Sequence, residues 1–209
     1  METRKTALYD VHQQAGAKLV EFAGYYMPIQ YRGIIEEHRR VRTTVGLFDV
    51  SHMGEFIVKG SNAEAFLQKI TINDVSKVDV RQVQYSAMCY PEGGIVDDLL
   101  IYRFPDHYLM VVNAANLDKD WEWANRHLIG GVTLTNESDR YSLLALQGPM
   151  AQKTLQKLTA LDLGKLDYYW LDEAEAAGVP MMISRTGYTG ELGYELMMPN
   201  ESAVKVWKA

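Results

Sequence analysis

The chain has 209 residues, of which 47% are hydrophobic, and it carries a formal net charge of −6. This composition allows a sizeable core, and the acidic balance argues against nucleic acid or an anionic membrane as the main partner. The single cysteine, Cys89, excludes an intramolecular disulfide and favours a reducing compartment. The sequence has no apolar run of membrane-spanning length and no signal peptide, so we expect a cytoplasmic protein.

The first third of the chain predicts two helices and two strands. In order, we expect a helix over residues 6–14, a strand over 18–22, a loop over 23–28, a helix over 34–45 and a strand over 47–59. The second helix rests on apolar residues at helical spacing, Ile34, Val41 and Val45. The long strand should bend near Gly54, because a glycine inside a strand is typical of a bulge.

The middle of the chain predicts a helix followed by an antiparallel meander. Ser61 and Glu64 have the spacing of a capping box, which predicts that a helix begins there. Three strands follow, at residues 83–89, around Asp97 and Asp98, and at 108–112. The short turns between these strands make an antiparallel arrangement the natural expectation. A helix from residue 113 to residue 128 should come next.

The last third adds more strands and a second candidate helix. We expect strands near residues 132–135, 142–147, 168–171, 181–184 and 194–198, and a helix over 150–158. Since strands and helices are mixed without a regular β-α-β order, we predict an α+β fold with largely antiparallel sheets and flanking helices. Residues 200–209 begin an amphipathic helix with no stop signal, from which we expect a truncated or fragmentary chain.

Two adjacent carboxylates, Asp97 and Asp98, lie in an apolar strand that follows Gly93 and Gly94. A buried aspartate is costly unless it is paired or hydrogen-bonded. Side chains alternate between the two faces of a strand, so these two acids cannot act as one dyad. Two interpretations remain open. Either this is an edge strand with both acids in water, or one acid is solvated or caps a neighbour while the other faces a cavity.

A second candidate site is the glycine-rich stretch from Ser184 to Glu195. Its glycine spacing fits neither the dinucleotide fingerprint nor a phosphate-binding P-loop. Spacing alone favours a plain hairpin connection, although the Arg, Tyr and Glu side chains of this stretch are typical of a binding loop. The five scattered histidines and the lone Cys89 predict no metal site.

Seven motifs, taken in order, resemble one known family. They are Leu8–His12, Phe22–Gly24 with Met27–Pro28, Gly46–Gly54, Gly93–Leu99, Val111–Asn116, Ala145–Pro149 and Arg185–Glu191. The family that they resemble is the T-protein of the glycine cleavage system, the tetrahydrofolate-dependent aminomethyltransferase. The resemblance covers nearly all 209 residues.

The resemblance implies a function and a set of site residues. Family members take the aminomethyl group carried on the dihydrolipoyl arm of the lipoylated H-protein, pass its one-carbon unit to the co-substrate tetrahydrofolate, and release ammonia. Asp98 matches the family's key acidic residue, whose carboxylate would stabilise iminium-like positive charge beside the folate nitrogens. The positions that match the family's folate-lining residues are Tyr85, Asn113, Tyr168, Tyr188 and Glu195.

The resemblance also implies a three-lobed fold, of which this chain would lack the C-terminal lobe. A first domain, residues 1–54 with 140–209, would be interrupted by an inserted second domain, residues 55–139. Leu192 stands where the family usually has an aspartate. Because family members are considerably longer, we expect weak or absent turnover from these 209 residues alone.

Two alternative functions remain open beside the transferase. The first is a non-catalytic folate-binding or interaction module of the same family, and binding of tetrahydrofolate without turnover would support it. The second is a relative that oxidises methylated glycines and is fused to a flavin domain. We rank the second alternative last, because the chain lacks a dinucleotide fingerprint.

Overall fold

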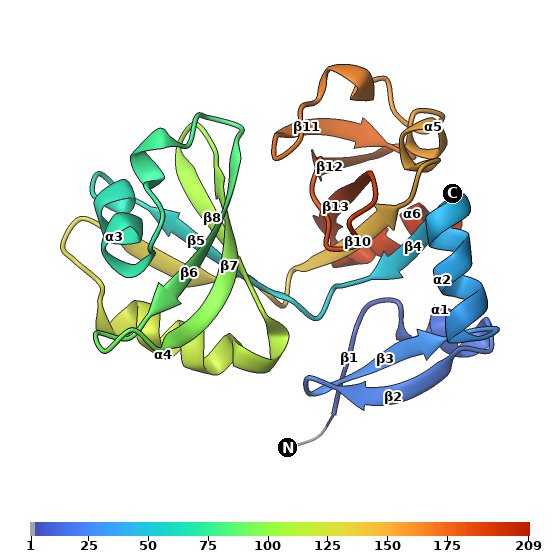
Figure 1. The fold of residues 1–209 in the computed structure, drawn as a ribbon, viewed down its shortest axis with the longest axis horizontal. Coiled ribbons are helices and arrows are strands. Elements are labelled where there is room, and N and C mark those ends of the chain that lie inside the picture. Colours follow the sequence, from blue (N-terminus) through green and yellow to red (C-terminus); the bar gives the residue numbers. More distant parts are fainter. Residues whose placement is uncertain (1–2) are drawn as a thin grey trace. The chain divides into compact units, whose positions relative to one another are not determined.

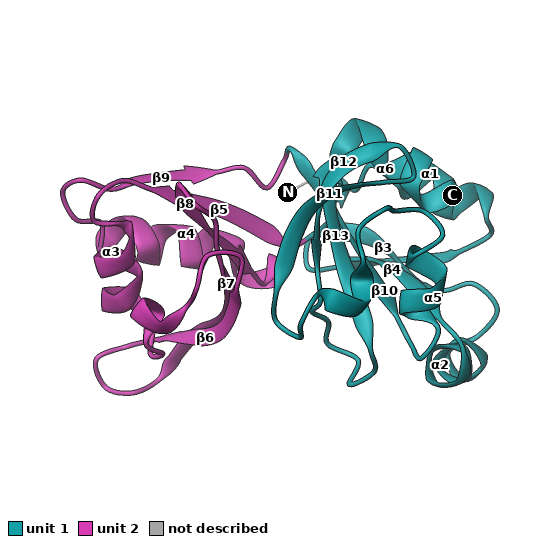
Figure 2. Ribbon diagram, turned by 90° about the horizontal axis from the view of Figure 1, so that it is seen from above, with its two compact units in different colours: residues 1–52, 140–209 teal, residues 53–139 magenta. Residues whose placement is uncertain are grey.

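The computed structural model describes residues 3–209 and divides the chain into two compact units (Figures 1 and 2). Unit 1 comprises residues 1–52 and 140–209, and unit 2 comprises residues 53–139. Both units combine largely antiparallel sheets with helices, so the predicted α+β class is confirmed. Within residues 3–209, none of the helices has the length and apolar character needed to cross a membrane.

The first sheet of unit 1 has three strands in the order β1, β3, β2. The elements here are β1 (Arg4–Lys5), α1 (Tyr9–Gln14), β2 (Lys18–Phe22), β3 (Tyr25–Gln30) and α2 (Ile34–Thr43). The loop predicted over residues 23–28 is wrong, because most of that segment belongs to β3. Ala23 and Gly24 both have positive φ, which allows the two-residue turn of a β-hairpin, and the buried Tyr25 and Met27 then alternate with more exposed neighbours.

The second sheet of unit 1 has five antiparallel strands in the order β11, β12, β13, β10, β4. These strands are β4 (Gly46–Asp49), β10 (Tyr141–Gln147), β11 (Leu171–Ala176), β12 (Val179–Ser184) and β13 (Gly193–Pro199). The accompanying helices are α5 (Ala151–Leu155), η3 (Leu163–Lys165), η4 (Asn200–Ser202) and α6 (Ala203–Lys208). The helix predicted over residues 150–158 is therefore shorter than expected, and the strand predicted near 168–171 begins only at Leu171.

Buried apolar side chains from this sheet and its helices form the core of unit 1. Its fully buried members include Leu8, Leu144, Ala151, Leu163, Ile183, Met198 and Ala203. Leu8 comes from the segment that precedes α1, so the N-terminal part of the chain is packed into the same core as the last strand and helix.

The long strand predicted over residues 47–59 is two strands in two different sheets. β4 ends at Asp49 in unit 1, and β5 (Gly54–Lys59) begins in unit 2. Asp49 supplies a reason for the break, because its carboxylate accepts a hydrogen bond from the backbone N–H of Ser51 at 3.0 Å. This local bond turns the chain out of the strand direction.

Unit 2 is a five-stranded antiparallel sheet in the order β6, β7, β8, β5, β9. Its strands are β5 (Gly54–Lys59), β6 (Val83–Cys89), β7 (Ile95–Arg103), β8 (His107–Val112) and β9 (Thr133–Asn136). The predicted meander of three strands is confirmed as β6, β7 and β8. β9 pairs with β5, and the Glu137 N–H donates to the Glu55 carbonyl at 2.9 Å, so the first and last strands of the unit are neighbours.

Helices α3 (Ala63–Ile70) and α4 (Leu117–Arg126), with η1 (Val75–Lys77) and η2 (Ala114–Asn116), complete unit 2. Phe56, Phe66, Leu67 and Met110 are fully buried members of its core. The predicted capping box is wrong, because Asn62 is the N-cap of α3 and no side chain caps the helix. The Asn62 amide instead donates to the Gly130 carbonyl at 2.7 Å.

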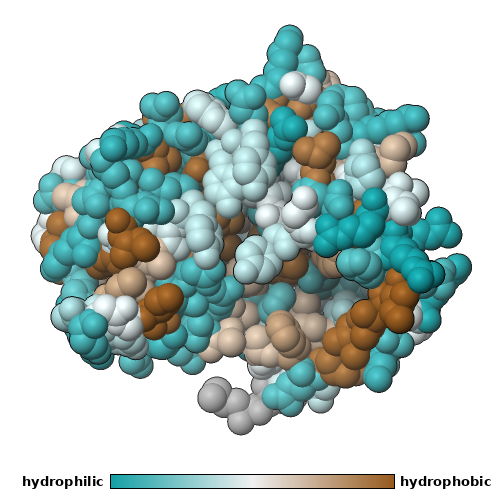
Figure 3. Space-filling model, viewed as in Figure 1, coloured by the Kyte–Doolittle hydropathy of each residue, from teal (hydrophilic) through white to brown (hydrophobic). Residues whose placement is uncertain are grey.

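The face drawn in Figure 3 carries separate hydrophobic patches, in brown, among teal hydrophilic residues. The most exposed large apolar side chains are Phe22, Ile34, Ile35, Ile72, Ile95, Tyr168 and Tyr188.

Candidate functional site

Asp98 lies at the centre of a small polar cluster in unit 2. Tyr85 on β6 donates its hydroxyl proton to Asp98 Oδ2 at 2.7 Å, and the Asn113 side-chain amide donates to Asp98 Oδ1 at 2.7 Å. The strand register explains the first contact. Tyr85 is paired with Leu100, two residues from Asp98 along β7, so both side chains lie on one face of the sheet. Asn113 directly follows β8 and reaches Asp98 from the other side.

Asp97 is buried, whereas Asp98 is partly exposed. The interpretation of an edge strand with both acids in water is therefore wrong, since β7 is flanked by β6 and β8. The buried Asp97 carboxylate accepts from the side-chain amides of Asn113, at 3.1 Å, and Asn116, at 2.8 Å. These donors offset the cost of burying its charge.

One buried acid that sequence reasoning missed also belongs to this cluster. Asp120, on α4, is fully buried beside Asp97. Burial, the hydrogen bond with Asp97 and the Asp97 charge raise the pKa of Asp120 to about 8. A signal did exist in the sequence. Asp120 lies one residue before Trp121 and follows Leu117 by three residues, so it falls on the apolar stripe of an amphipathic helix.

Two other predicted site residues, Tyr168 and Glu195, lie in unit 1, and both act on Tyr169. The rings of Tyr168 and Tyr169 are 4.7 Å apart, and 65% of Tyr168 is exposed. Burial, Tyr168 and the charge of Glu195 together raise the pKa of Tyr169. The Glu195 carboxylate, on β13, accepts a hydrogen bond from the Thr186 hydroxyl. Unit 1 thus presents a carboxylate and two aromatic rings in one neighbourhood.

Tyr188 stands apart from that group, with 96% of its surface exposed. Together with Thr189 it lines a cavity of about 670 Å³ in unit 1, whose other walls come from residues 28–49 and Trp207. The cavity lining mixes apolar side chains with arginines. It includes Ile29, Ile34, Phe48, Arg32, Arg40 and Arg42. No motif in the sequence predicts this cavity.

The glycine-rich stretch between β12 and β13 is held by the side chain of Gln147. The Gln147 amide donates to the Thr186 carbonyl at 3.1 Å and accepts from the Thr189 hydroxyl at 2.8 Å. A Cβ atom at Gly187 or Gly193 would overlap this amide. These glycines therefore leave room for Gln147, which is a physical reason for their spacing that the sequence alone did not offer.

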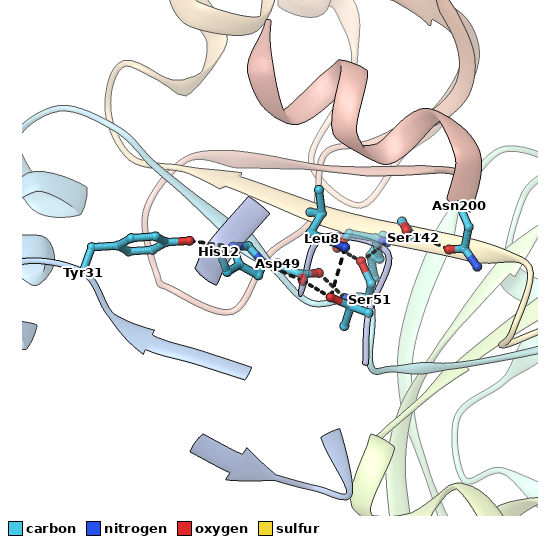
Figure 4. A network of polar contacts seen from close by, with 9 residues as sticks. Leu8, His12, Tyr31, Asp49, Ser51, Ser142 and Asn200 are labelled. Atoms are coloured by element: carbon cyan, nitrogen blue, oxygen red, sulfur yellow. Dashed lines mark hydrogen bonds and ion pairs between the residues drawn. The ribbon is translucent and has the colours of Figure 1, made fainter. Parts of the chain in front are cut away.

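A separate buried network crosses unit 1 (Figure 4). The Asp49 carboxylate is 2.9 Å from His12 Nε2 and accepts the Thr6 hydroxyl proton at 2.8 Å. The other ring nitrogen of His12 is 2.7 Å from the Tyr31 hydroxyl. Burial and the nearby carboxylates of Asp49 and Glu37 raise the pKa of Tyr31 to about 12. The network ties the segment around α1 to the end of β4.

Glu55, on β5, is a buried acid that belongs to none of these clusters. Both of its carboxylate oxygens are buried and have no hydrogen-bond partner within residues 3–209. Burial and the charge of Asp139 raise its pKa well above the usual value. A group of this kind weakens the fold once the pH exceeds its unfolded-state pKa, because the unfolded chain releases its proton more readily.

We therefore expect Glu55→Gln to raise the free energy of unfolding by about 1–3 kcal/mol at pH 8, because an amide removes the cost of a buried acid. The difference from wild type should shrink as the pH falls toward 4, where the unfolded chain also holds the proton. Urea unfolding at pH 8 and pH 4.5 measures both effects. Glu92→Gln, at an exposed turn, is the matched control, and an equal gain from both variants would contradict the explanation.

Comparisons with known proteins show which family shares this architecture. Residues 8–209 match the family described as the GCVT N-terminal domain. An aminomethyltransferase of Desulfitobacterium hafniense (strain Y51) is 53% identical to the chain over 209 residues, and one of Geobacillus sp. (strain WCH70) is 52% identical over 208. Each match covers 99% of this chain but 57% of the relative, so the chain spans little more than half the length of these relatives.

Among solved structures, the glycine cleavage system aminomethyltransferase T from Bartonella henselae matches with a TM-score of 0.90 and 32% identity, covering 99% of this chain and 56% of that one. A heterotetrameric sarcosine oxidase from Corynebacterium sp. U-96 matches with a TM-score of 0.56 and 17% identity, over 82% of this chain and 86% of that one. At that identity, the sarcosine oxidase shows a shared fold alone.

The fold is therefore of the aminomethyltransferase T class. The chain belongs to the GCVT N-terminal domain family, and the resemblance predicted from its motifs is confirmed.

Proposed function

We propose that this chain works in a glycine cleavage aminomethyltransferase. In that role it moves the one-carbon unit of the aminomethyl group on lipoylated H-protein to tetrahydrofolate, with release of ammonia. The observation that carries the proposal is the partly exposed Asp98 carboxylate, held at both oxygens by Tyr85 and Asn113. The match to proteins named aminomethyltransferase supports the same reaction.

In this proposal, Asp98 works by electrostatic stabilisation. When ammonia leaves the aminomethyl carbon, positive charge develops there, and a fixed carboxylate stabilises that charge more than a mobile one does. Two hydrogen bonds to Asp98 fix its orientation before the reaction begins. The same carboxylate can accept a proton from a folate nitrogen within hydrogen-bond reach.

We assign the folate-binding role to Tyr85, Asn113, Tyr168, Tyr188 and Glu195. A carboxylate such as that of Glu195 can accept two parallel N–H donors from an aminopyrimidine edge. Exposed tyrosine rings offer flat apolar surface with a polar tip. We further propose that residues 1–54 with 140–209 and residues 55–139 are separate domains and that the protein works in the cytoplasm. The compact units 1–52 with 140–209 and 53–139 support this division.

Two measurements test the proposed function. Isothermal titration with tetrahydrofolate measures binding, and ammonia release from aminomethyl-loaded H-protein, with and without tetrahydrofolate, measures turnover. Folate-dependent release supports the transferase. Binding without turnover would instead support a non-catalytic folate-binding module. Absence of both would refute the proposal.

Tyr85→Phe should lower kcat by about tenfold, because the ring stays while a hydrogen bond to a charged group is lost. The free energy of unfolding should change little, since Tyr85 is 48% exposed. Steady-state kinetics and urea unfolding measure the two quantities. Tyr26→Phe, a partly exposed tyrosine of β3, is the control. Equal kcat values for Tyr85→Phe and wild type would show that this hydroxyl does not orient Asp98.

A further inference from the structure

Behind Asp98, on the opposite face of β7, lie two further carboxyl groups that interact electrostatically, those of Asp97 and Asp120. Asp97 and Asp120 are both buried, and Asp120 is completely shielded from solvent. The two oxygens of Asp120 receive no hydrogen bond from an N–H or O–H donor in the described part of the chain. The group that Asp120 faces is the Asp97 carboxyl, with which it can form a side-chain hydrogen bond.

Two carboxyl groups can share a hydrogen bond only if one of them carries a proton. Asp97 accepts two amide donors, from Asn113 and Asn116. Asp120 has no such donors, so the shared proton belongs on Asp120. The other charged groups that act on Asp120 are Asp98, on β7, and Lys119, on α4. The Lys119 ammonium donates to the Val96 carbonyl.

The Asn113 amide connects this buried pair to Asp98. Its nitrogen lies 3.1 Å from Asp97 Oδ1 and 2.7 Å from Asp98 Oδ1, so the same amide group contacts both acids. The backbone N–H of Asn113 points to Asp97 Oδ2 as well, at 3.4 Å. A displacement of Asp97 would therefore move Asn113, and with it one of the two donors that hold Asp98.

We propose that Asp120 is a positioning residue for Asp98: its protonated carboxyl donates to Asp97, and Asp97 holds Asn113 in the orientation that fixes the Asp98 carboxylate. Only the expected kinetic effect of this inference rests on the proposed function. The chain of contacts runs from α4 through β7 to the end of β8, entirely within unit 2. Asp120 touches no substrate in this scheme, so its effect is on orientation rather than on chemistry.

The kinetic test uses two substitutions in the protein. Asp120→Leu removes the donor to Asp97 and should lower kcat by about 10- to 100-fold. Asp120→Asn keeps a donor that cannot ionise, so it should restore kcat to within a few-fold of wild type. Wild-type activity should decline as Asp120 loses its proton above about pH 8, and this decline should be absent in Asp120→Asn.

Asp118→Asn, at an exposed position of the same helix, is the matched control and should leave both kcat and the pH profile unchanged. A wild-type kcat in Asp120→Leu, or the same alkaline decline in Asp120→Asn, would overturn the positioning role. The positioning role would also be overturned if both Asp120 variants lost activity and both lost the same free energy of unfolding.

A second measurement does not need turnover. Carbon-13 NMR of selectively labelled aspartate should show one protonated carboxyl at pH 7 in the wild-type chain, and this signal should be absent in Asp120→Asn. If every aspartate is ionised at pH 7, the proposal fails even where the transferase assay succeeds. If the protonated carboxyl is present but the wild type shows no turnover, the hydrogen bond stands and the proposed function fails.

Discussion

Replacing Asp98 by asparagine is expected to lower kcat for folate-dependent ammonia release by about 10²- to 10⁴-fold. The change removes the negative charge and keeps the size of the side chain, so the stabilisation of developing positive charge is lost while the packing is retained. Asp98 is partly exposed and on a strand flanked on both sides, so the free energy of unfolding should change by less than about 1 kcal/mol. Ammonia release and urea unfolding, measured together, separate the two effects.

Asp79→Asn, an exposed acid that precedes β6, controls for the general effect of removing one charge. It should leave kcat unchanged. An Asp98→Asn variant that folds normally and releases ammonia at the wild-type rate would show that Asp98 has no part in the reaction.

The second large effect is expected at Asp49, in the buried network of unit 1. Asp49→Ala should lower the free energy of unfolding by about 3–5 kcal/mol, because it leaves His12, the Thr6 hydroxyl and the Ser51 N–H without their acceptor. Although burial opposes ionisation, the hydrogen bonds from His12, Ser51 and Thr6 outweigh it and lower the pKa of Asp49. Chemical denaturation monitored by tryptophan fluorescence measures the loss.

The pH dependence of this loss has a definite sign. A lowered pKa means that Asp49 stabilises the fold above its unfolded pKa of about 3.9, and that this contribution disappears as the pH falls through the lower folded value. The difference between wild type and Asp49→Ala should therefore narrow below pH 4. Glu21→Ala, at an exposed position of β2, should cost less than about 0.5 kcal/mol at any pH. Comparable losses in the two variants would rule out a special role for the network.

Much of the fold could be predicted from local patterns, and the exceptions have physical reasons. The meander around Asp97 was predictable because its strands are contiguous and joined by short turns. The hairpin at Tyr25 was missed because its turn, Ala23–Gly24, was read as the beginning of a loop. The single strand predicted over residues 47–59 failed because the break depends on the Asp49 carboxylate bonding to the Ser51 N–H, a contact that periodicity does not reveal.

For the candidate site, alternation along β7 predicted that Asp97 and Asp98 face opposite ways, but it could not say which is buried. That answer depends on Asn113, Asn116 and Asp120, which come from elements that follow later in the chain. Gln147 was missed for the same kind of reason. Its role depends on Gly187 and Gly193, which follow it by 40 and 46 residues, and no local pattern joins positions so distant.

The pairing of β5 with β9 has a consequence for how this chain reaches its folded state. The two strands lie at the beginning and end of unit 2, so once they pair, the two ends of the inserted segment are held together. Before β5 and β9 pair, the two parts of unit 1 can meet only by closing a loop as long as the whole insertion. The entropic cost of closing a loop grows with its length. After they pair, the two parts of unit 1 are already joined to neighbouring ends of β5 and β9. Early folding of the insertion therefore lowers the entropic barrier for the interrupted unit, whose two halves are otherwise remote along the chain.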